Sequence, residues 1–208
     1  MTPDASQLAE MVLAQVGTAT RFMVAIAGPP GAGKSTLAES LQQALRERGE
    51  TAAVLPMDGF HMDNAILIER GWLPRKGAPH TFDVRGLKDV LSAVRVADVE
   101  VLVPVFDRSR ELAIASARAV SPSDRFILVE GNYLLLAEKP WSDLAQLFDF
   151  SIFIAPSNAT LESRLRDRWR HYGLSDAAAD EKLNENDLPN GRLVLGASRR
   201  ADVTVVED

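Results

Sequence analysis

The chain has 208 residues, with 23 lysines and arginines against 29 aspartates and glutamates, a net charge of −6 and no cysteine. The acidic balance argues against general nucleic-acid binding, and the lack of cysteine excludes disulfide and thiolate–metal frameworks. No apolar run is long enough to span a bilayer, and the first residues lack the features of a signal peptide. We therefore expect a single cytoplasmic domain over residues 1–208 with no membrane or nucleic-acid partner; a homodimer is compatible with the sequence.

The first elements are a strand, a glycine-rich loop and a helix. A short helix is predicted over residues 4–16, and the unbroken apolar run over 22–27 predicts a buried strand. The next eight residues match G-x-x-x-x-G-K-[ST] at every fixed position, and apolar residues at helical spacing follow. In such a loop, backbone N–H groups and the helix N-terminus bind phosphate, the lysine reaches the β- and γ-phosphates, and the hydroxyl holds Mg²⁺. The predicted nucleotide-binding residues are Gly28, Pro29, Pro30, Gly31, Ala32, Gly33, Lys34, Ser35 and Thr36, with Ser35 also a metal ligand.

A second strand, predicted over 51–56, ends just before Asp58. Ligands of open α/β sheets lie at the carboxyl ends of strands, where a catalytic carboxylate would stand. An aspartate before a glycine is also a common turn pair, so Asp58 is either a catalytic base or a turn residue. One or two helical turns over 64–70 lead into residues 71–82, which are irregular and rich in glycine, proline and basic residues. A loop of this kind favours ligand binding, with a plain solvated loop as the alternative.

The middle of the chain is predicted to contain a helix and three strands. The helix covers 84–98, and the strand after it, 99–106, is followed closely by Arg108. Residues 112–120 are predicted as a strand, which is either a hairpin partner or a sheet edge. A third, apolar strand over 125–131 carries Glu130 at its end. An acid at this place helps to hold Mg²⁺ or its waters in nucleotide-binding folds.

The last third continues the alternation of helices and strands. The predicted elements are a short helix over 140–147, a strand over 150–155, a helix over 157–172, a helix that starts at Ser175 or Asp176 and runs through 185, and a strand over 201–206. Arg164 and Arg168 lie one turn apart along one edge of the apolar stripe of the first long helix. Strands that alternate with helices indicate right-handed crossovers and a mainly parallel sheet with helices on both faces, that is, a three-layer α/β fold.

These motifs together resemble those of the phosphoribulokinase, uridine kinase and pantothenate kinase family of P-loop kinases. The resemblance is carried by the phosphate-binding loop, by Pro56-Met57-Asp58-Gly59-Phe60-His61, by Arg70-Gly71 with Lys76–Asp83, and by Val129–Leu135. The sequence is closer still to bacterial proteins named putative fructose transport system kinases. That likeness rests on Arg164-x-x-x-Arg168-Trp169 and on Glu185–Leu193.

The resemblance covers residues 20–206 and implies a P-loop NTPase fold, ATP and Mg²⁺ as cofactors, and a small helical lid over about 157–190. It implies that the catalytic residues are Asp58 as base, Lys34, and Arg164 and Arg168 of the lid. Glu130 is then a metal-site acid, and Asn186 and Asn190 join the nucleotide-binding set. The candidate residues for holding the acceptor are His61, Arg70, Lys76, His80, Arg108 and Tyr133.

Two functions compete on this basis. The leading hypothesis is a kinase that transfers the γ-phosphate of ATP to a hydroxyl of a small metabolite, such as fructose or another sugar, or a pantothenate- or nucleoside-like alcohol. The alternative is a regulatory P-loop ATPase or nucleotide-binding switch without an acceptor. The sequence contains neither an Asn-Lys-x-Asp guanine reader nor a Leu-Ser-Gly-Gly transporter signature. A switch has no need of Asp58 beside a basic loop, so the kinase is favoured.

Overall fold

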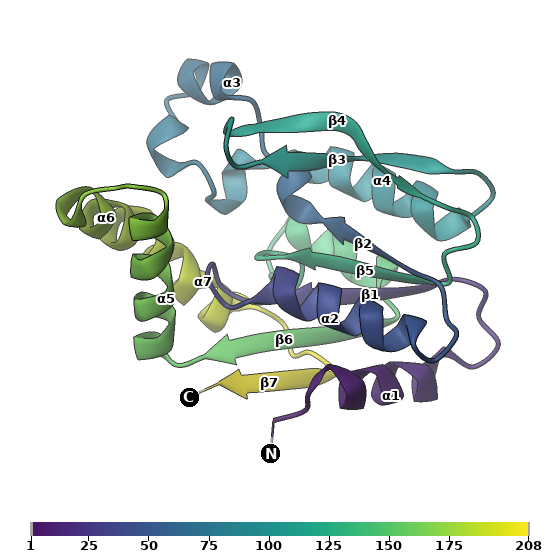
Figure 1. Cartoon of the computed structure of the whole chain (residues 1–208). Helices are drawn as coiled ribbons and strands as arrows, with labels where there is room; N and C mark the ends of the chain where they lie inside the picture. The colour runs from purple at the N-terminus through teal and green to yellow at the C-terminus, as the bar shows by residue number, and fades with distance from the viewer. Residues whose placement is uncertain (1, 208) are drawn as a thin grey trace.

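The computed structural model describes residues 2–207 and centres on a five-stranded parallel sheet with strand order β2-β5-β1-β6-β7 (Figure 1). The strands are β1 (Phe22–Ala27), β2 (Ala52–Pro56), β5 (Phe126–Gly131), β6 (Phe150–Pro156) and β7 (Val203–Glu207). In the central pair, Phe22 lies opposite Phe126 and Ala27 opposite Gly131. Every residue of β1 and β5 is buried, which explains why both appear in the sequence as continuous apolar runs.

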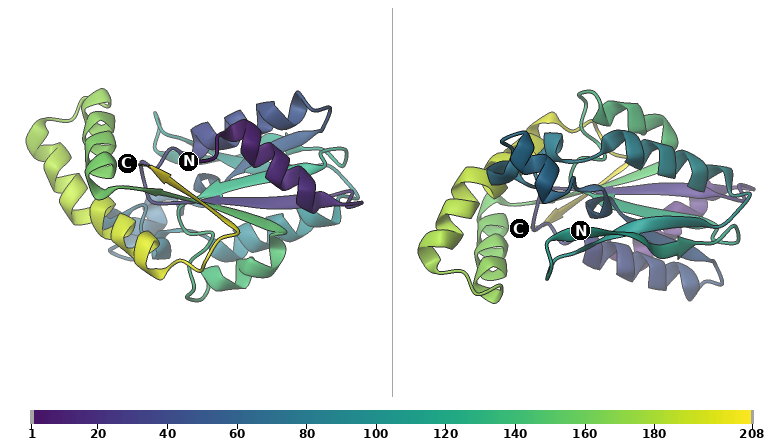
Figure 2. Two further views of the ribbon diagram at one scale, coloured as in Figure 1. Left: turned by 90° about the horizontal axis from the view of Figure 1, so that it is seen from below. Right: turned by 90° about the horizontal axis from the view of Figure 1, so that it is seen from above.

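Helices cover both faces of this sheet, so the molecule has three layers (Figure 2). Alternate residues of β1 face opposite sides: Val24 packs in the cluster with the first two helices, and Met23 packs in the cluster on the other face. The elements concerned are α1 (Ala5–Val16) and α2 (Lys34–Arg46) on one face, and α4 (Val84–Val96) with a 3₁₀ helix over Trp141–Leu147 on the other. The prediction of a three-layer α/β fold with a mainly parallel sheet is confirmed.

Strands β3 (Val101–Asp107) and β4 (Leu112–Val120) form a separate antiparallel ribbon outside the main sheet. The ribbon lies over β2, and a guanidinium nitrogen of Arg118 donates to the Val54 carbonyl at 2.7 Å (Figure 1). Residues 112–120 are therefore the hairpin partner, one of the two alternatives that the sequence left open. This arrangement carries the turn at Arg108–Glu111 over the carboxyl end of β2.

The connection from β2 to α4, called here the 57–83 loop, contains short helical pieces. They are 3₁₀ turns at Met57–Phe60, Leu73–Arg75 and Pro79–Thr81, and helix α3 (Asn64–Glu69). The Thr81 hydroxyl donates to the Ala78 carbonyl at 2.8 Å and accepts from the Gly77 N–H at 3.0 Å. Local bonds of this kind give a defined shape to residues 71–82, which the sequence predicts as irregular.

The C-terminal helices extend beyond the carboxyl ends of the strands, at the left of Figure 1. Helix α5 (Asn158–His171) is followed by α6 (Asp176–Lys182), a π-helical turn over Leu183–Asp187, and α7 (Leu188–Ala197). Helix α7 has no counterpart in the sequence prediction, because Pro189-Asn190-Gly191 is typical of a loop. The proline lies in the first turn of the helix, where its missing N–H would have no intrahelical partner. Across residues 2–207, none of the helices combines the length and apolar character needed to cross a membrane.

Candidate active site

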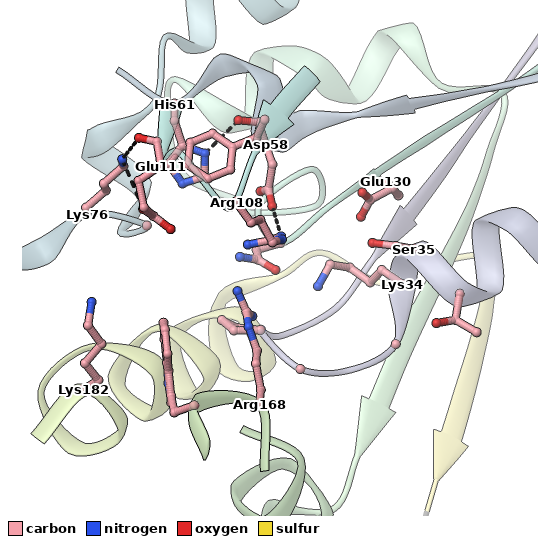
Figure 3. Close-up of a pocket in the computed structure, with 18 residues that line it drawn as sticks. Lys34, Ser35, Asp58, His61, Lys76, Arg108, Glu111, Glu130, Arg168 and Lys182 are labelled. Carbon is pink, nitrogen blue, oxygen red and sulfur yellow. Dashed lines mark hydrogen bonds and ion pairs between the residues drawn. The ribbon is translucent and has the colours of Figure 1, made fainter. Parts of the chain in front are cut away.

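A cleft of about 280 Å³ opens beside the phosphate-binding loop, where β1, β2 and β5 end (Figure 3). Its walls come from the loop over 28–35, the 57–83 loop, the β3–β4 turn and the α5–α6 helices. The charged residues that line it are Lys34, Asp58, Lys76, Arg108, Glu111, Glu130, Arg168 and Lys182. Segments far apart in the sequence thus place ionisable groups around one cavity.

The loop over 28–35 has the backbone geometry that phosphate binding requires. Gly31 and Gly33 have φ angles of 80° and 85°, which favour glycine, and Gly33 immediately precedes α2. A Cβ atom at Gly31 would also lie 3.0 Å from the Leu165 side chain of α5. The unpaired N–H groups at the start of α2 therefore face the cleft, a favourable position for an anion. Of the nine predicted nucleotide-binding loop residues, the cleft is lined by Pro30, Gly31, Gly33, Lys34, Ser35 and Thr36, while Gly28, Pro29 and Ala32 are buried.

Lys34 is buried at the start of α2, and its ammonium donates to the Pro29 carbonyl at 2.9 Å. Burial lowers the pKa of Lys34 to about 8, although the carboxylates of Glu130 and Asp58 act in the opposite direction. A lysine that has lost its hydration in this way gains strongly from a phosphate oxygen.

Asp58 lies two residues after β2, and the β3–β4 turn brings Arg108 to it. The Arg108 guanidinium donates to Asp58 Oδ2 at 2.5 Å, and His61 Nδ1 lies 2.7 Å from the Asp58 carbonyl oxygen. Burial raises the pKa of the Asp58 carboxyl, but the charges of His61, Arg108 and Lys34 outweigh burial, so its pKa lies below the ordinary value. Asp58 is therefore ionised at neutral pH, with Oδ1 available for a further hydrogen bond.

Glu130 and Ser35 face each other across the base of the cleft (Figure 3). Burial and the nearby Asp58 charge raise the pKa of Glu130, and Lys34 and the Ser35 hydroxyl oppose that rise. A buried carboxylate next to a hydroxyl is a donor set that suits Mg²⁺, which binds few protein ligands and takes the rest from phosphates and water. Within residues 2–207 no group of three or more histidines, cysteines or acids is arranged to hold a metal alone. These residues fit a magnesium ion that arrives with a nucleotide.

The opposite wall carries Arg168 and Trp169 from α5 and Lys182 from the end of α6. Arg168 points across the cleft toward Arg108 (Figure 3), and burial together with the Arg108 charge lowers the pKa of Arg168. Two guanidinium groups that face each other in this way leave room for an anion between them. Trp169 is held by its Nε1–H, which donates to the Asp187 carboxylate at 2.6 Å.

Arg164 does not reach this cleft, although the sequence places it beside Arg168 on one helix edge. Its guanidinium pairs with Glu207 at the end of β7 at 2.5 Å. Both residues line a separate hollow of about 550 Å³ that also includes Gly33, Thr36 and Ser40. Side chains four residues apart on a helix point about 40° apart around its axis. Gly31 of the phosphate loop packs against Leu165 between them, and the two arginines line different cavities.

Asn186 and Asn190 are also absent from the cleft lining. Instead, the Arg75 guanidinium donates to Asn186 Oδ1 and to Asn190 Oδ1, each at 3.2 Å, and the Asn186 amide donates to the Lys76 carbonyl at 2.8 Å. These bonds tie the 57–83 loop to the α6–α7 junction. Asn186 binds the backbone of Lys76, Asn190 binds Arg75 and Asn186, and their expected role with the nucleotide stays a prediction.

Three of the predicted acceptor residues lie outside the cleft. Arg70 stacks on Trp72, with its guanidinium carbon 5.1 Å from the ring centroid, and His80 packs edge-on against the same ring. His80 also lines an apolar cavity of about 270 Å³ behind the 57–83 loop. Tyr133 is fully buried, and its hydroxyl donates to the Gly77 carbonyl at 2.5 Å. His61, Lys76 and Arg108 do line the cleft, as predicted for acceptor contacts.

Sequence reasoning missed five side chains of the cleft: Phe106, Glu111, Asn132, Trp169 and Lys182. The spacing of Trp169 assigns it to the apolar stripe of its helix. Only the structure shows that it also lines the cleft, with its indole N–H bound to Asp187. Glu111 is the last of the polar and charged residues that come after the strand predicted over 99–106, and this pattern was a weak signal for a site. Lys182 lies in a solvated helix with no pattern that distinguishes it from its neighbours.

Comparison with known proteins identifies the family. The family described as methylmalonyl Co-A mutase-associated GTPase MeaB matches residues 2–68, which end within α3. The uncharacterized protein YggC of Escherichia coli is 37% identical over 195 residues, with 93% of this chain and 81% of YggC covered. The Putative uridine kinase C227.14 of Schizosaccharomyces pombe is 33% identical over 180 residues, with 82% and 76% covered. The chain belongs to the uridine kinase, pantothenate kinase and phosphoribulokinase family of P-loop kinases.

A crystal structure extends this likeness to nearly the whole kinase. It is named as a putative fructose transport system kinase from Silicibacter sp. TM1040, and it superposes with a TM-score of 0.93 at 43% identity. The match covers 97% of this chain and 98% of that one. The protein is accordingly an ATP-dependent small-molecule kinase, and the cleft in Figure 3 is the candidate site of its phosphoryl transfer.

Proposed function

We propose that this kinase transfers the γ-phosphate of ATP to a hydroxyl of a small metabolite that binds at the end of the cleft away from the loop over 28–35. The observation that carries the proposal is the position of Asp58. It stands in one cavity with Lys34 and Glu130, on the side that also offers His61 and Lys76. A nucleotide switch needs the phosphate loop but has no use for an ionised carboxylate beside a second, basic subsite.

In this proposal the ATP phosphates lie along the N–H groups of the loop and on Lys34. The hollow beside Gly33 and Thr36 is the place for the nucleoside, with Arg164 at its edge. Ser35 and Glu130 would hold Mg²⁺ together with the phosphates, and the ion would supply positive charge against the charge of the phosphates. Arg168 and Arg108, which face each other across the cleft, stabilise the negative charge of the group in transit.

Asp58 acts on the acceptor. Its free Oδ1 accepts the proton of the attacking hydroxyl as that oxygen forms a bond to the γ-phosphorus and the bond from phosphorus to the ADP oxygen breaks. The pKa of Asp58 is lowered, so its carboxylate is a weak base. A weak base is sufficient when the proton leaves the acceptor hydroxyl after the bond between the γ-phosphorus and ADP has largely broken. Arg108 holds the carboxylate in position through Oδ2.

The acceptor class is open between a sugar and an alcohol of nucleoside or pantothenate type. The fructose name of the similar crystal structure supports a sugar, and the uridine kinase name of a relative supports a nucleoside. The test is ADP release by the wild type with a panel of sugars, nucleosides and pantothenate, alongside Asp58→Asn. We expect at least one alcohol to stimulate release. Asp58→Asn should reduce that transfer by about 10²–10⁴-fold with near-normal ATP affinity. ATP turnover that ignores every alcohol would instead support a switch.

A further inference from the structure

The end of the cleft away from the phosphate loop contains two lysines from opposite walls. Lys76 comes from the 57–83 loop and Lys182 from the last turn of α6. In Figure 3 both lie on the side of the cavity opposite Lys34 and Ser35. Neither is needed for the roles given above to the loop, the metal site or Asp58.

The Lys76 ammonium is held in one position. It donates to Asn64 Oδ1 at 2.8 Å and to the Glu111 carbonyl at 2.6 Å, and it lies 5.0 Å from the Phe106 ring centroid. The side chain retains 13% of its exposure, so little water remains around the charge. Its acidic partner is the Glu111 carboxylate at 3.3 Å, which is itself 59% exposed. An exposed carboxylate at that distance is readily replaced by another anion.

Glu111 reaches Lys76 only through an unusual backbone conformation. Its φ angle is 55°, in the left-handed region that a glutamate seldom adopts. The residue lies at the turn between β3 and β4, and this conformation turns both its carbonyl and its carboxylate toward Lys76. A left-handed residue is common at the end of a short hairpin loop, and here it sets the Glu111 carboxylate beside Lys76 at the edge of the cleft.

Lys182 offers a second positive charge, and the acid whose pKa it lowers, Asp187, already accepts the Trp169 indole N–H. No salt bridge to Lys182 is present in the part of the chain from residue 2 to residue 207. Its side chain is exposed, its ammonium lies 5.0 Å from the Trp169 ring centroid, and both residues line the cavity. The distal end of the cleft therefore combines one desolvated lysine, one unpaired lysine and two aromatic faces.

We propose that the phosphate acceptor is an anionic alcohol, whose carboxylate or phosphate group binds between Lys76 and Lys182 in place of the Glu111 carboxylate. The inference rests on the proposed kinase function and names its substrate class. The anionic group fixes the acceptor at the distal end, and the hydroxyl extends from there toward Asp58. Glu111 is a specificity-determining residue, since it competes with the anion in the free protein.

The first experiment compares neutral polyols and sugars with related compounds that carry a carboxylate or a phosphate group. ADP release is measured with glycerol, D-glycerate and glycerol 3-phosphate, and with fructose, gluconate and fructose 6-phosphate. We expect the anionic member of a series to have a KM at least about tenfold below that of its neutral counterpart, as befits a charge-assisted contact. The carboxylate and phosphate arms distinguish the two sources of the anion. A neutral alcohol that is used as well as its anionic partners would overturn the proposal.

The second experiment uses variants of the two lysines. Lys182→Met and Lys76→Met should each raise the KM for the anionic acceptor by about 10- to 100-fold and change the KM for ATP by less than about twofold. Lys139→Met is the matched control, because Lys139 is an exposed lysine outside the cleft. Glu111→Gln should lower the KM for the anionic acceptor several-fold. A rise in the KM for ATP with no change for the acceptor would assign the lysines to the nucleotide and overturn the proposal.

A binding measurement separates failure of this inference from failure of the kinase proposal. D-glycerate or inorganic phosphate is titrated into the protein saturated with Mg²⁺ and a non-hydrolysable ATP analogue, and Trp169 fluorescence reports binding, with Trp169→Phe as the control. A signal lost in Lys182→Met supports the anion site even if no alcohol stimulates ADP release. Absence of any Lys182-dependent signal overturns the site even if a neutral alcohol proves to be a substrate.

Discussion

Replacing each of the two arginines of α5, Arg164 and Arg168, by alanine tests the division between the two cavities. Arg168 is half-buried and points into the cleft, whereas Arg164 is exposed and pairs with Glu207. We expect Arg168→Ala to lower kcat strongly with little change in the KM for ATP. Arg164→Ala, one turn earlier on the same helix, is the matched control.

The magnitude follows from the position of Arg168. A guanidinium about 4 Å from a transferring phosphoryl group, in a half-buried cleft with an effective dielectric constant of about 20, contributes about 4 kcal/mol. Since about 1.4 kcal/mol is a factor of ten in rate, kcat should fall by about 10³-fold. The Arg164–Glu207 pair is solvent-exposed, so its loss should lower the free energy of unfolding by less than about 1 kcal/mol.

Steady-state ADP release with a saturating acceptor measures both variants. For Arg164→Ala, kcat should remain within about twofold of the wild type, and any effect should be a modest rise in the KM for ATP, because its hollow is the proposed nucleoside site. Equal losses of kcat in the two variants would show that both arginines act on the γ-phosphate. A kcat for Arg168→Ala within about threefold of the wild type would refute its proposed role.

Three further predictions concern Lys34 of the phosphate loop, Asn186 of the π-helical turn and Gly59 of the 57–83 loop. Phosphate favours the charged form of Lys34, whose pKa is about 8 in the free protein, so ATP affinity should be retained below that pH and fall by up to about tenfold per pH unit above it. Calorimetry of ATP binding near pH 8.5, in two buffers with different ionisation enthalpies, should show that binding takes up protons. An ATP affinity that does not change with pH would contradict the prediction. Asn186→Ala removes hydrogen bonds to Arg75 and the 57–83 loop, so the acceptor KM should rise several-fold while that of ATP stays constant; an unchanged acceptor KM would mean that other contacts hold the loop. Gly59→Ala puts a Cβ 2.3 Å from the Pro104 carbonyl oxygen, so the free energy of unfolding should fall by about 1–3 kcal/mol. The measurement is the thermal melting curve of the variant, and a midpoint equal to that of the wild type would contradict the prediction.

Local patterns in the sequence were sufficient for the features that depend on one strand and the residues next to it. The loop over 28–35 follows a buried strand, Asp58 lies two residues after β2, and Glu130 lies at the end of β5. Parallel strands align their carboxyl ends at one edge, so three separate strand ends predict one cavity without any tertiary information. The three-layer fold follows similarly from the alternation of strands and helices.

Contacts across long sequence separations had to be seen in the folded chain. Spacing on a helix placed Arg164 and Arg168 together, but the phosphate loop packed against α5 directs them to different cavities. Asn186 has the side chain of a ligand-binding residue, yet Arg75, 111 residues away, uses its oxygen. Glu111 and Lys182 became visible as site residues only where a hairpin turn and a helix end meet over one cleft. Helical and strand periodicity describes which face a residue occupies, whereas what stands opposite that face depends on how the elements pack.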